Sequence, residues 1–328
     1  MNAPTPRLSI GLPVYNGEPF LADAIDSLLA QTFRDFELII SDNASTDGTE
    51  AICRERAARD PRVRYLRSDT NRGATWNFNR VFELARGEYF KWAAHDDRHE
   101  PAFLARCVEA LDRDPEVVLA CTRLVDIDEH DAPHPVEELH MKWDSPHQCV
   151  RFRALARPDH RCESIFGVIR TEVLRRTPLL SDYAGCDRVL LAEIALAGRF
   201  HEVPEVLFLH REHRRRSTKA YNDEQTRTEW FDPAKAGRPA FPHMKMLRGY
   251  TRVIRRSRVA RMHKAVCMFT LVGWTLRNRP GLWKDLTFAL RHTRRSRGTS
   301  AAATAPPRAS HDRPVPRDDR AEARHRRA

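Results

Sequence analysis

The stretch Phe90-Lys91-Trp92-Ala93-Ala94-His95-Asp96-Asp97 decides how the rest of the chain is interpreted. Apolar and aromatic residues typical of a buried strand end there in two adjacent carboxylates. Open α/β sheets bind ligands at the carboxyl ends of their strands, which is where these carboxylates would lie. Taken alone, the pair is better explained as solvated loop acids or as caps of a following helix, because Asp is common in both places. The rest of the chain makes a ligand site a better explanation than a solvated loop or a helix cap.

Length and composition indicate a chain that can bury a full hydrophobic core. Its 328 residues suffice for one large domain or two smaller ones. No apolar run reaches the roughly 18–20 residues of a membrane span, and residues 1–7 lack the apolar core of a signal peptide, which predicts a cytoplasmic protein. The seven cysteines form no C-x-x-C pair, so the sequence favours neither a disulfide framework nor a zinc ribbon.

The net charge of +11 is unevenly distributed along the chain. Residues 245–279 carry ten Lys and Arg and no acid, and residues 291–328 carry eleven Arg against four acids. The first 244 residues therefore have a net negative charge. This asymmetry predicts an anionic partner, either a membrane or a nucleic acid, for the C-terminal quarter.

Strands and helices alternate over the first hundred residues. The predicted strands lie at 8–13, 36–40, 63–66 and 90–93, and the predicted helices lie at 20–29, around Ile52 and Cys53, and at 75–85. Further strands are expected at 117–127, 164–170 and 203–209, with a helix at 188–197 and a covering loop at 128–160. Such alternation predicts βαβ units and a parallel, doubly wound sheet.

Two nucleotide-binding motifs are absent from the sequence, and polar residues recur at the predicted strand ends. No G-x-G-x-x-G follows the first strand and no P-loop sequence occurs, so neither a dinucleotide enzyme nor a P-loop NTPase is supported. Polar residues instead stand at three strand ends: Tyr15 and Asn16, then Asp42, then Asp96 and Asp97. Three such positions at one edge of a parallel sheet favour a ligand site over incidental loop acids.

A set of segments between about residues 7 and 217 shares its order with a known family. They are Pro13-Val14-Tyr15-Asn16, Ser41-Asp42-Asn43-Ala44-Ser45-Thr46-Asp47-Gly48-Thr49, Asn71-Arg72-Gly73, Ala85-Arg86-Gly87-Glu88-Tyr89, His95-Asp96-Asp97, Asp187 and Arg211-Glu212-His213. Together they resemble the inverting family 2 glycosyltransferases. The resemblance implies a GT-A fold, an α/β architecture with a Rossmann-like, mostly parallel or mixed sheet flanked by helices.

Domain boundaries follow from the resemblance and from composition. We expect the catalytic domain at 1–230 and a basic, partly apolar helical extension at 231–292. Residues 293–328 are rich in Ala, Pro, Arg and Ser and are expected to be disordered.

The resemblance also implies a donor site for a nucleotide-diphosphate sugar. It assigns the nucleotide base to Asp42, with Pro13, Tyr15 and Asn16 lining the same pocket, and the diphosphate to Arg72, Asp96 and Arg211. The metal, Mg²⁺ or Mn²⁺, is assigned to Asp96, Asp97 and His213, since hard oxygen ligands suit these cations and the cation assists departure of the diphosphate. Ala94 stands where many members carry the first Asp of a D-x-D motif, so the acids are assigned as a pair.

Each assignment has a structural alternative. Asp42 also fits an Asx-turn or a helix cap, and Arg72 fits a solvated loop charge. Arg211 and His213 also fit the basic surface run 211–216.

Asp187 is the candidate general base. An inverting transfer needs a carboxylate that takes the proton of the acceptor hydroxyl and forms no covalent intermediate. The alternative is that Asp187 caps the helix that follows it.

The segment 244–290 mixes basic and apolar residues. Basic flanks, the apolar run 265–276 and the interfacial-type Trp274 suit a helix on an anionic bilayer. Packing of 265–276 and 282–290 on the catalytic domain or on a second subunit explains the pattern equally well. Nucleic-acid binding is less favoured, because the basic tail has no interleaved aromatic residues.

The sequence thus predicts a nucleotide-sugar-dependent, hexosyltransferase-type enzyme, cytoplasmic or peripheral on the inner face of the cell membrane. It would transfer sugar to a glycan or lipid-linked hydroxyl acceptor in cell-surface polysaccharide or glycolipid assembly. The alternatives are a nucleotidyltransferase, or a catalytically inactive nucleotide-binding or membrane-scaffold homologue.

Overall fold

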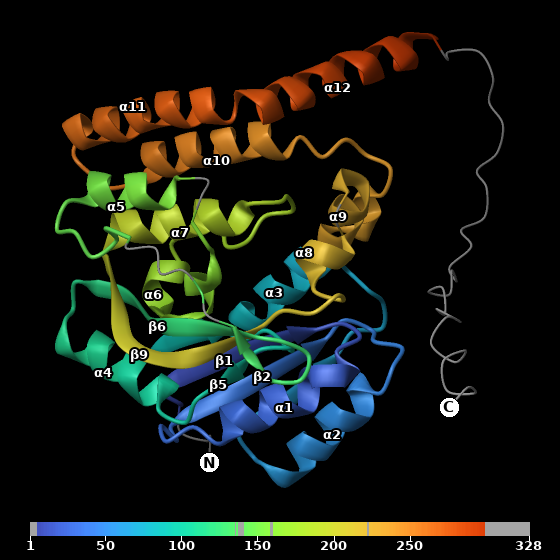
Figure 1. Cartoon of the computed structure of the whole chain (residues 1–328), viewed down its shortest axis with the longest axis vertical. Helices are drawn as coiled ribbons and strands as arrows, with labels where there is room; N and C mark the ends of the chain where they lie inside the picture. The colour runs from blue at the N-terminus through green and yellow to red at the C-terminus, as the bar shows by residue number, and fades with distance from the viewer. Residues whose placement is uncertain (1–4, 135, 137–140, 158–159, 222, 299–328) are drawn as a thin grey trace, which may run out of the picture. The chain divides into compact units, whose positions relative to one another are not determined.

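The computed structural model describes residues 5–134, 136, 141–157, 160–221 and 223–298 (Figure 1). The strands are β1 (Leu8–Val14), β2 (Phe36–Asp42), β3 (Val63–Arg67), β4 (Tyr89–Trp92), β5 (Arg98–His99), β6 (Val117–Ile127), β7 (Pro133–His134), β8 (Val168–Arg170) and β9 (Arg199–Arg211). The helices are α1 (Glu18–Leu29), α2 (Thr49–Arg59), α3 (Ala74–Glu83), α4 (Phe103–Arg113), α5 (Gln148–Leu155), α6 (Thr171–Leu174), α7 (Cys186–Ala197), α8 (Ser217–Ala220), α9 (Glu224–Phe231), α10 (Pro242–Arg256), α11 (Arg261–Arg277) and α12 (Arg279–Gly298), with 3₁₀ helices at Glu163–Phe166 and Pro233–Lys235.

The strands form one mixed sheet. Its order is β3-β2-β1-β4-β8-β6-β9-β5, with β7 paired to β6 outside this path. The first four strands are parallel, β6 and β9 are also parallel, and β8 runs antiparallel between β4 and β6. Every residue of β1 and β2 is buried, as expected for central strands covered on both faces. The predicted α/β class and mixed sheet are confirmed.

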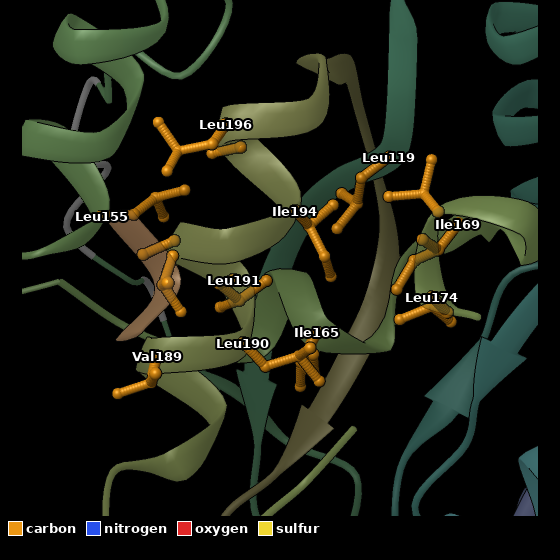
Figure 2. Packing of buried hydrophobic residues seen from close by; sticks show 14 of the residues in the cluster. Leu119, Leu155, Ile165, Ile169, Leu174, Val189, Leu190, Leu191, Ile194 and Leu196 are labelled. Atoms are coloured by element: carbon orange, nitrogen blue, oxygen red, sulfur yellow. The ribbon is translucent and has the colours of Figure 1, made fainter. Parts of the chain in front are cut away.

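Helices cover both faces of this sheet, and successive residues within a strand belong alternately to two hydrophobic clusters. Leu38 and Ile40 belong to the cluster that includes α1 and α4, whereas Ile39 belongs to the cluster that includes α3 and α7. Successive residues of a strand point to opposite faces, which explains the division. Figure 2 shows the second cluster, where leucines and isoleucines of α7 pack against Leu119 of β6 and Ile169 of β8.

The first strand continues past Pro13, where we expected it to end. The ladder between β1 and β4 ends at the pair Gly11–Trp92, after which Ala93 N donates to Gly11 O. Pro13 has the same strand parity as Gly11, so its missing N–H faces the side where β4 has already ended. The proline therefore removes no ladder hydrogen bond, and β1 reaches Val14.

Other boundaries also differ from the predictions. The segment 164–170 is a 3₁₀ helix followed by the short strand β8, and the final strand is longer than 203–209, running over β9. Residues 128–160 include β7 and α5 rather than an uninterrupted loop. These differences lie in pairings between distant segments, which local periodicity does not encode.

Helices α10 and α11 pack on helices α7 and α5 of the preceding part of the chain. Residues 1–288 form one compact unit and residues 289–328 a second. Tyr250, Val253 and Ile254 of α10 are buried, and α12 ends at Gly298. The domain boundaries at 230 and 292 stay predictions. Residues 299–328, which hold most of the expected disordered tail, lie outside the described residues.

Helix α11 presents two different faces. Cys267, Leu271 and Trp274 are buried, so Trp274 is a packing residue that contacts Tyr250 rather than an interfacial one. Met262, Val266 and Phe269 lie on the opposite, exposed face. Among the described residues, no helix is both long enough and apolar enough to cross a bilayer.

A buried cation in β4 gives a stability prediction. Lys91 is completely buried, its Nζ donates to Phe166 O, and burial lowers its pKa to about 7 against the opposing effects of Cys107 and Asp97. Between pH 7 and the ordinary Lys pKa the unfolded chain binds more protons than the folded chain, so the free energy of unfolding rises with pH over that window. We expect a rise of about 2 kcal/mol between pH 7 and 9.

Replacement of Lys91 by Met should remove this rise, as measured by urea unfolding at pH 7, 8 and 9. Lys142→Met, at an exposed position, serves as the control and should keep the wild-type slope. An unchanged slope in Lys91→Met would show that Lys91 is not the titrating group.

Candidate active site

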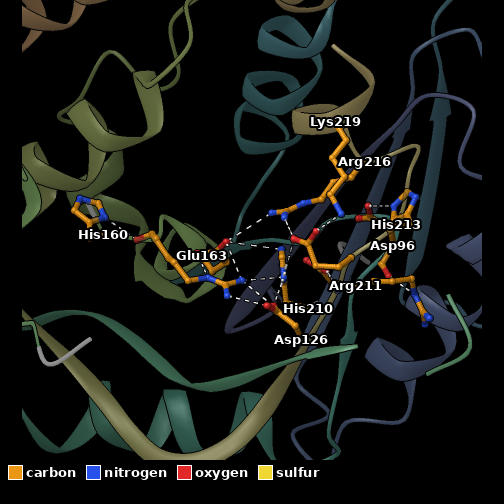
Figure 3. A network of polar contacts seen from close by, with 12 residues as sticks. Asp96, Asp126, His160, Glu163, His210, Arg211, His213, Arg216 and Lys219 are labelled. Carbon is orange, nitrogen blue, oxygen red and sulfur yellow. Dashed lines mark hydrogen bonds and ion pairs between the residues drawn. The ribbon is translucent and has the colours of Figure 1, made fainter. Parts of the chain in front are cut away.

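Asp96 and His213 form the centre of the candidate site. The chain leaves β4 at Trp92, and Asp96 lies just before β5, which pairs with β9. Nε2 of His213 is 2.8 Å from Oδ2 of Asp96 (Figure 3). Burial alone would raise the pKa of Asp96, but His95 and the hydrogen bond from His213 outweigh it and lower the pKa to about 2. Asp96 is therefore an ionised carboxylate.

Asp97 has a different environment from its neighbour. Its Oδ1 accepts a hydrogen bond from the backbone N–H of Arg211 at 2.9 Å, so the carboxyl group faces β9. Burial and the adjacent charge of Asp96 raise the pKa of Asp97 well above its usual value. The environment therefore disfavours the charged form of Asp97 while it favours that of Asp96.

Arg211 holds the loops around Asp96. Its side chain is 1% exposed; Nε donates to Asp96 O at 3.0 Å and Nη1 donates to Asp128 O at 2.8 Å. Nη2 lies 2.7 Å from Oδ1 of Asp131, and the guanidinium stacks on Phe20 at 4.7 Å. The predicted contact of Arg211 with a diphosphate does not fit this burial, so Arg211 is a positioning residue in this arrangement.

Asp96 and His213 supply two neighbouring donor atoms for a metal. Among the described residues, no cluster of three or more His, Cys, Asp or Glu is arranged to hold a metal ion. Mg²⁺ and Mn²⁺ sites often use one or two protein side chains and complete their shell with water and substrate phosphates. The Asp96–His213 pair fits a cation that arrives with a diphosphate, whereas Oδ1 of Asp97 accepts the hydrogen bond from Arg211 N.

A network of charged residues continues from this pair and was missed by sequence reasoning (Figure 3). Asp126 stands near the end of β6 and accepts two hydrogen bonds from Arg161, at 2.8 and 2.9 Å. His210 Nδ1 is 2.7 Å from the same carboxylate, and Arg216 pairs with Glu212 and with Glu163, the latter at 3.6 Å. An acid near a strand end was the signal used for Asp42 and Asp96, and Asp126 carries the same signal.

Asp42 ends β2 and is completely buried. Oδ1 accepts from Ser45 N and Oδ2 from Tyr65 Oη, each at 2.8 Å, and Arg67 Nε lies 3.3 Å from Oδ2. The bond to Ser45 is a local turn interaction, the alternative that the sequence left open. Both carboxylate oxygens already have partners, so Asp42 shapes the loop after β2.

The end of β1 meets this loop. Asn16 adopts a left-handed φ of 53°, its N–H donates to Ser45 Oγ at 3.0 Å, and its Oδ1 accepts from Thr46 N at 2.8 Å. Tyr15 is 37% exposed beside it. Pro13 is buried within β1 behind these residues. Tyr15 and Asn16 thus form an accessible rim above the buried Asp42.

Arg72 is exposed at the same sheet edge. Its N–H donates to Asn43 Oδ1 at 3.0 Å, and its guanidinium stacks on the Trp76 ring at 4.2 Å. Asn43 also donates from Nδ2 to Asn71 Oδ1 at 2.8 Å. Sequence reasoning missed the buried Asn43, which ties the Arg72 loop to the end of β2.

Asp187 lies in the first turn of α7 rather than at its cap. The cap is Gly185, with φ +88°, where a Cβ would come within 2.6 Å of the Met246 sulfur of α10. The half-buried Asp187 carboxylate accepts from Arg188 N at 2.8 Å, and it raises the pKa of the Cys162 thiol, after the larger effect of burial. The segment 160–163 therefore lies beside Asp187, and it also carries Glu163, a member of the charged network.

The chain matches known proteins in sequence. Residues 9–177, more than half of the chain, match the model of glycosyl transferase family 2. The putative glycosyltransferase EpsE of Bacillus subtilis is 32% identical over 38% of this chain and 45% of its own length. The uncharacterised protein Rv1520 of Mycobacterium tuberculosis is 32% identical over 61% of this chain and 57% of its own length. The matches thus span less than two thirds of these relatives.

Solved structures share the fold at low sequence identity. S. aureus TarS 1-349 in complex with UDP-GlcNAc superposes with a TM-score of 0.63 at 16% identity, over 85% of this chain and 79% of that one. The mannosyltransferase PcManGT of Pyrobaculum calidifontis gives 0.52 at 18% identity, over 92% and 77%. The GT-A fold expected from the sequence is confirmed. With more than half of its length matching the family model, the chain belongs to glycosyl transferase family 2.

Proposed function

We propose that the protein is an inverting glycosyltransferase that transfers a sugar from a nucleoside-diphosphate donor to a hydroxyl acceptor in cell-surface polysaccharide or glycolipid assembly. The ionised Asp96 held against His213 at the end of β4 is the observation that carries the proposal. Similar folds support it: TarS is described with UDP-GlcNAc, and PcManGT with GDP-Man and Mn²⁺.

The donor would lie along the carboxyl edge of β1, β2 and β4. Tyr15 and Asn16 would contact the nucleotide, while Asp42 fixes the loop beneath them. Arg72 is exposed at the same edge, and its guanidinium makes no ion pair with any acid in the described ranges, so it is available to a phosphate. Asp96 and His213 would hold Mg²⁺ or Mn²⁺, which when bound neutralises the leaving diphosphate.

The acceptor would be activated by Asp187. Asp187 stands in the first turn of α7, where a negatively charged side chain interacts favourably with the free backbone N–H groups and the helix dipole. Asp187 would take the proton of the acceptor hydroxyl as the hydroxyl oxygen bonds to the anomeric carbon and the bond to the diphosphate breaks. The configuration at that carbon inverts in a single displacement.

A thermal-shift panel of nucleotide sugars, each with and without Mn²⁺, tests donor use directly. We expect at least one donor to raise Tm, with a larger rise when Mn²⁺ is present, because ligands that bind only the folded state stabilise it. The same donor should then release nucleoside diphosphate slowly. Binding without any turnover would favour an inactive homologue, and no shift from any donor would contradict the proposal.

We also propose that α11 rests on an anionic membrane. Its exposed face carries Met262, Val266, Phe269, Val272 and Leu276, each 49–78% exposed, at helical spacing. Arg261 and Arg277 stand at the two ends of the helix. Apolar residues on one face and flanking cations suit shallow insertion among anionic head groups.

Liposome co-sedimentation tests this attachment. The protein should sediment with vesicles rich in phosphatidylglycerol, less at high salt, and Phe269→Ser should weaken the binding by about tenfold because it removes a large buried apolar area. Val206→Ser, at an exposed apolar position outside the C-terminal helices, is the control. Equal binding of both variants would remove α11 as the contact.

A further inference from the structure

A cleft between α10 and α12 is not used by the proposed reaction. Its volume is about 650 Å³, within the range typical of ligand pockets. Its apolar part is made by Met244, Leu247, Leu282 and Leu286, together with the methyl-bearing Thr251. Its polar part is made by Arg248, Arg252, Arg255 and Arg256. The cleft therefore joins an apolar surface to four cations.

The two helices that form the cleft are held together by specific contacts. Asp285 of α12 is 2% exposed, and its Oδ2 accepts a hydrogen bond from Met244 N, in the first turn of α10, at 2.9 Å. Gly281 lies so close to His243 that a Cβ would come within 2.3 Å of its Nε2. These contacts fix the start of α12 against the start of α10, so the cleft is a built feature of the compact unit.

Within the described residues, three of the four arginines of α10 have no acidic partner, whereas Arg256 interacts electrostatically with the carboxylate of Glu193. Within the described part of the chain, the guanidinium groups of Arg248, Arg252 and Arg255 make no hydrogen bond or ion pair, and Arg256 donates only to Arg176 O, at 3.3 Å. All four are exposed, and α10 contains no acidic residue. Like charges four residues apart on a helix destabilise it. An anion bound among them would relieve this repulsion.

A second cavity continues from the arginines toward α7. It has a volume of about 260 Å³ and shares Arg248, Arg252 and Arg256 with the cleft. On its other side it is lined by Tyr183 and Cys186 and by two acids, Asp182 and Glu193, and Cys186 immediately precedes Asp187. The shared arginines thus stand between an apolar cleft and the helix that carries the proposed base.

We propose that this cleft binds the phosphate end of an anionic lipid. The alkyl chain would lie on Leu247, Leu282 and Leu286, and the phosphate would be bound by Arg248 and Arg252, whose planar donor groups suit phosphate oxygens. A group attached beyond the phosphate would then extend along the second cavity toward α7. This last point rests on the proposed function, because it makes the lipid the carrier of the acceptor hydroxyl.

The apolar part and the cationic part of the cleft together favour an anionic lipid over other ligands. A free phosphate ion would use the arginines but not the apolar side chains, which include Met244 and Leu286 at 46% and 41% exposure. A neutral lipid would use the apolar side chains but leave Arg248, Arg252 and Arg255 without an anionic partner. An anionic amphiphile satisfies both parts of the cleft.

The test uses the full chain and short-chain lipids below their micelle concentration, measured by isothermal titration calorimetry. Dihexanoylphosphatidic acid should bind, and inorganic phosphate and dihexanoylphosphatidylcholine should bind at least about tenfold more weakly. The double variant Arg248→Gln/Arg252→Gln should lose about tenfold or more in affinity for the phosphatidic acid. The matched control Arg238→Gln/Arg258→Gln removes the same charge from exposed arginines outside the cleft and should stay within about twofold.

Three results would overturn the proposal: no binding of the phosphatidic acid, equal loss in both double variants, or equal binding of inorganic phosphate. Equal loss would mean that the basic quarter attracts anions diffusely, and equal phosphate binding would mean that the apolar side chains are not used. Lipid binding is measured without donor and donor hydrolysis is measured without lipid. Either proposal can therefore fail while the other stands.

Discussion

Replacement of Asp187 by Asn should lower the rate of sugar transfer by about 10²–10⁴-fold, the usual contribution of a general base. Asn keeps the size of the side chain and can still accept the hydrogen bond from Arg188 N, but it cannot take a proton. Donor affinity should not change, because Asp187 lies on α7 and the proposed donor residues follow β1, β2 and β4. Transfer assays with a saturating acceptor, combined with thermal shifts for the donor, measure both quantities.

Asp26→Asn is the matched control for this experiment. Asp26 lies on α1 and forms an ion pair with Arg56, so its loss should affect stability more than transfer. Full turnover in Asp187→Asn would exclude Asp187 as the base. If Asp187→Asn lost both donor binding and turnover, the role of Asp187 would instead be structural.

Replacement of Asp96 by Asn should lower kcat/KM for the donor by about 10²–10³-fold, because it removes the charged oxygen that would bind the cation. The dependence of activity on Mn²⁺ concentration should weaken at the same time. The low pKa of Asp96, about 2, means that wild-type Asp96 stays ionised at all pH values of practical assays. Its stabilising pair with His213 should be lost only as the pH falls from the ordinary Asp pKa toward 2.

The neighbouring substitution Asp97→Asn provides an internal comparison. Asp97 has a raised pKa, and Asn can still accept the hydrogen bond from Arg211 N. Its effect on kcat/KM should therefore be smaller than that of Asp96→Asn by about tenfold or more. A larger effect of Asp97→Asn would reverse the assignment of the two acids.

The sequence predicted the sheet well where the fold depends on local pattern. Buried runs such as 36–40 and the amphipathic helices between strands identified the parallel half of the sheet. The position of β8 between β4 and β6 could not be predicted, because it depends on pairing between residues more than 40 positions apart. The 3₁₀ helix before β8 shares its apolar composition with a strand.

Site residues were easier to identify than their roles. Asp96 and His213 meet as the resemblance implied. Asp42 and Arg211 lie in the expected segments, but their side chains are buried and bonded to Tyr65 and to the 128–131 turn. Sequence shows that a carboxylate or a guanidinium is present at a strand end, whereas its accessibility depends on which distant loop packs over it.

The two-sided character of α11 has a kinetic consequence. A helix buried on one side and apolar on the other would keep the catalytic unit within a thin layer at a bilayer surface. An acceptor anchored in that bilayer would then be encountered by lateral diffusion, at an effective concentration set by its surface density. Apparent KM for such an acceptor should follow its mole fraction in the vesicle, whereas KM for the water-soluble donor should follow bulk concentration.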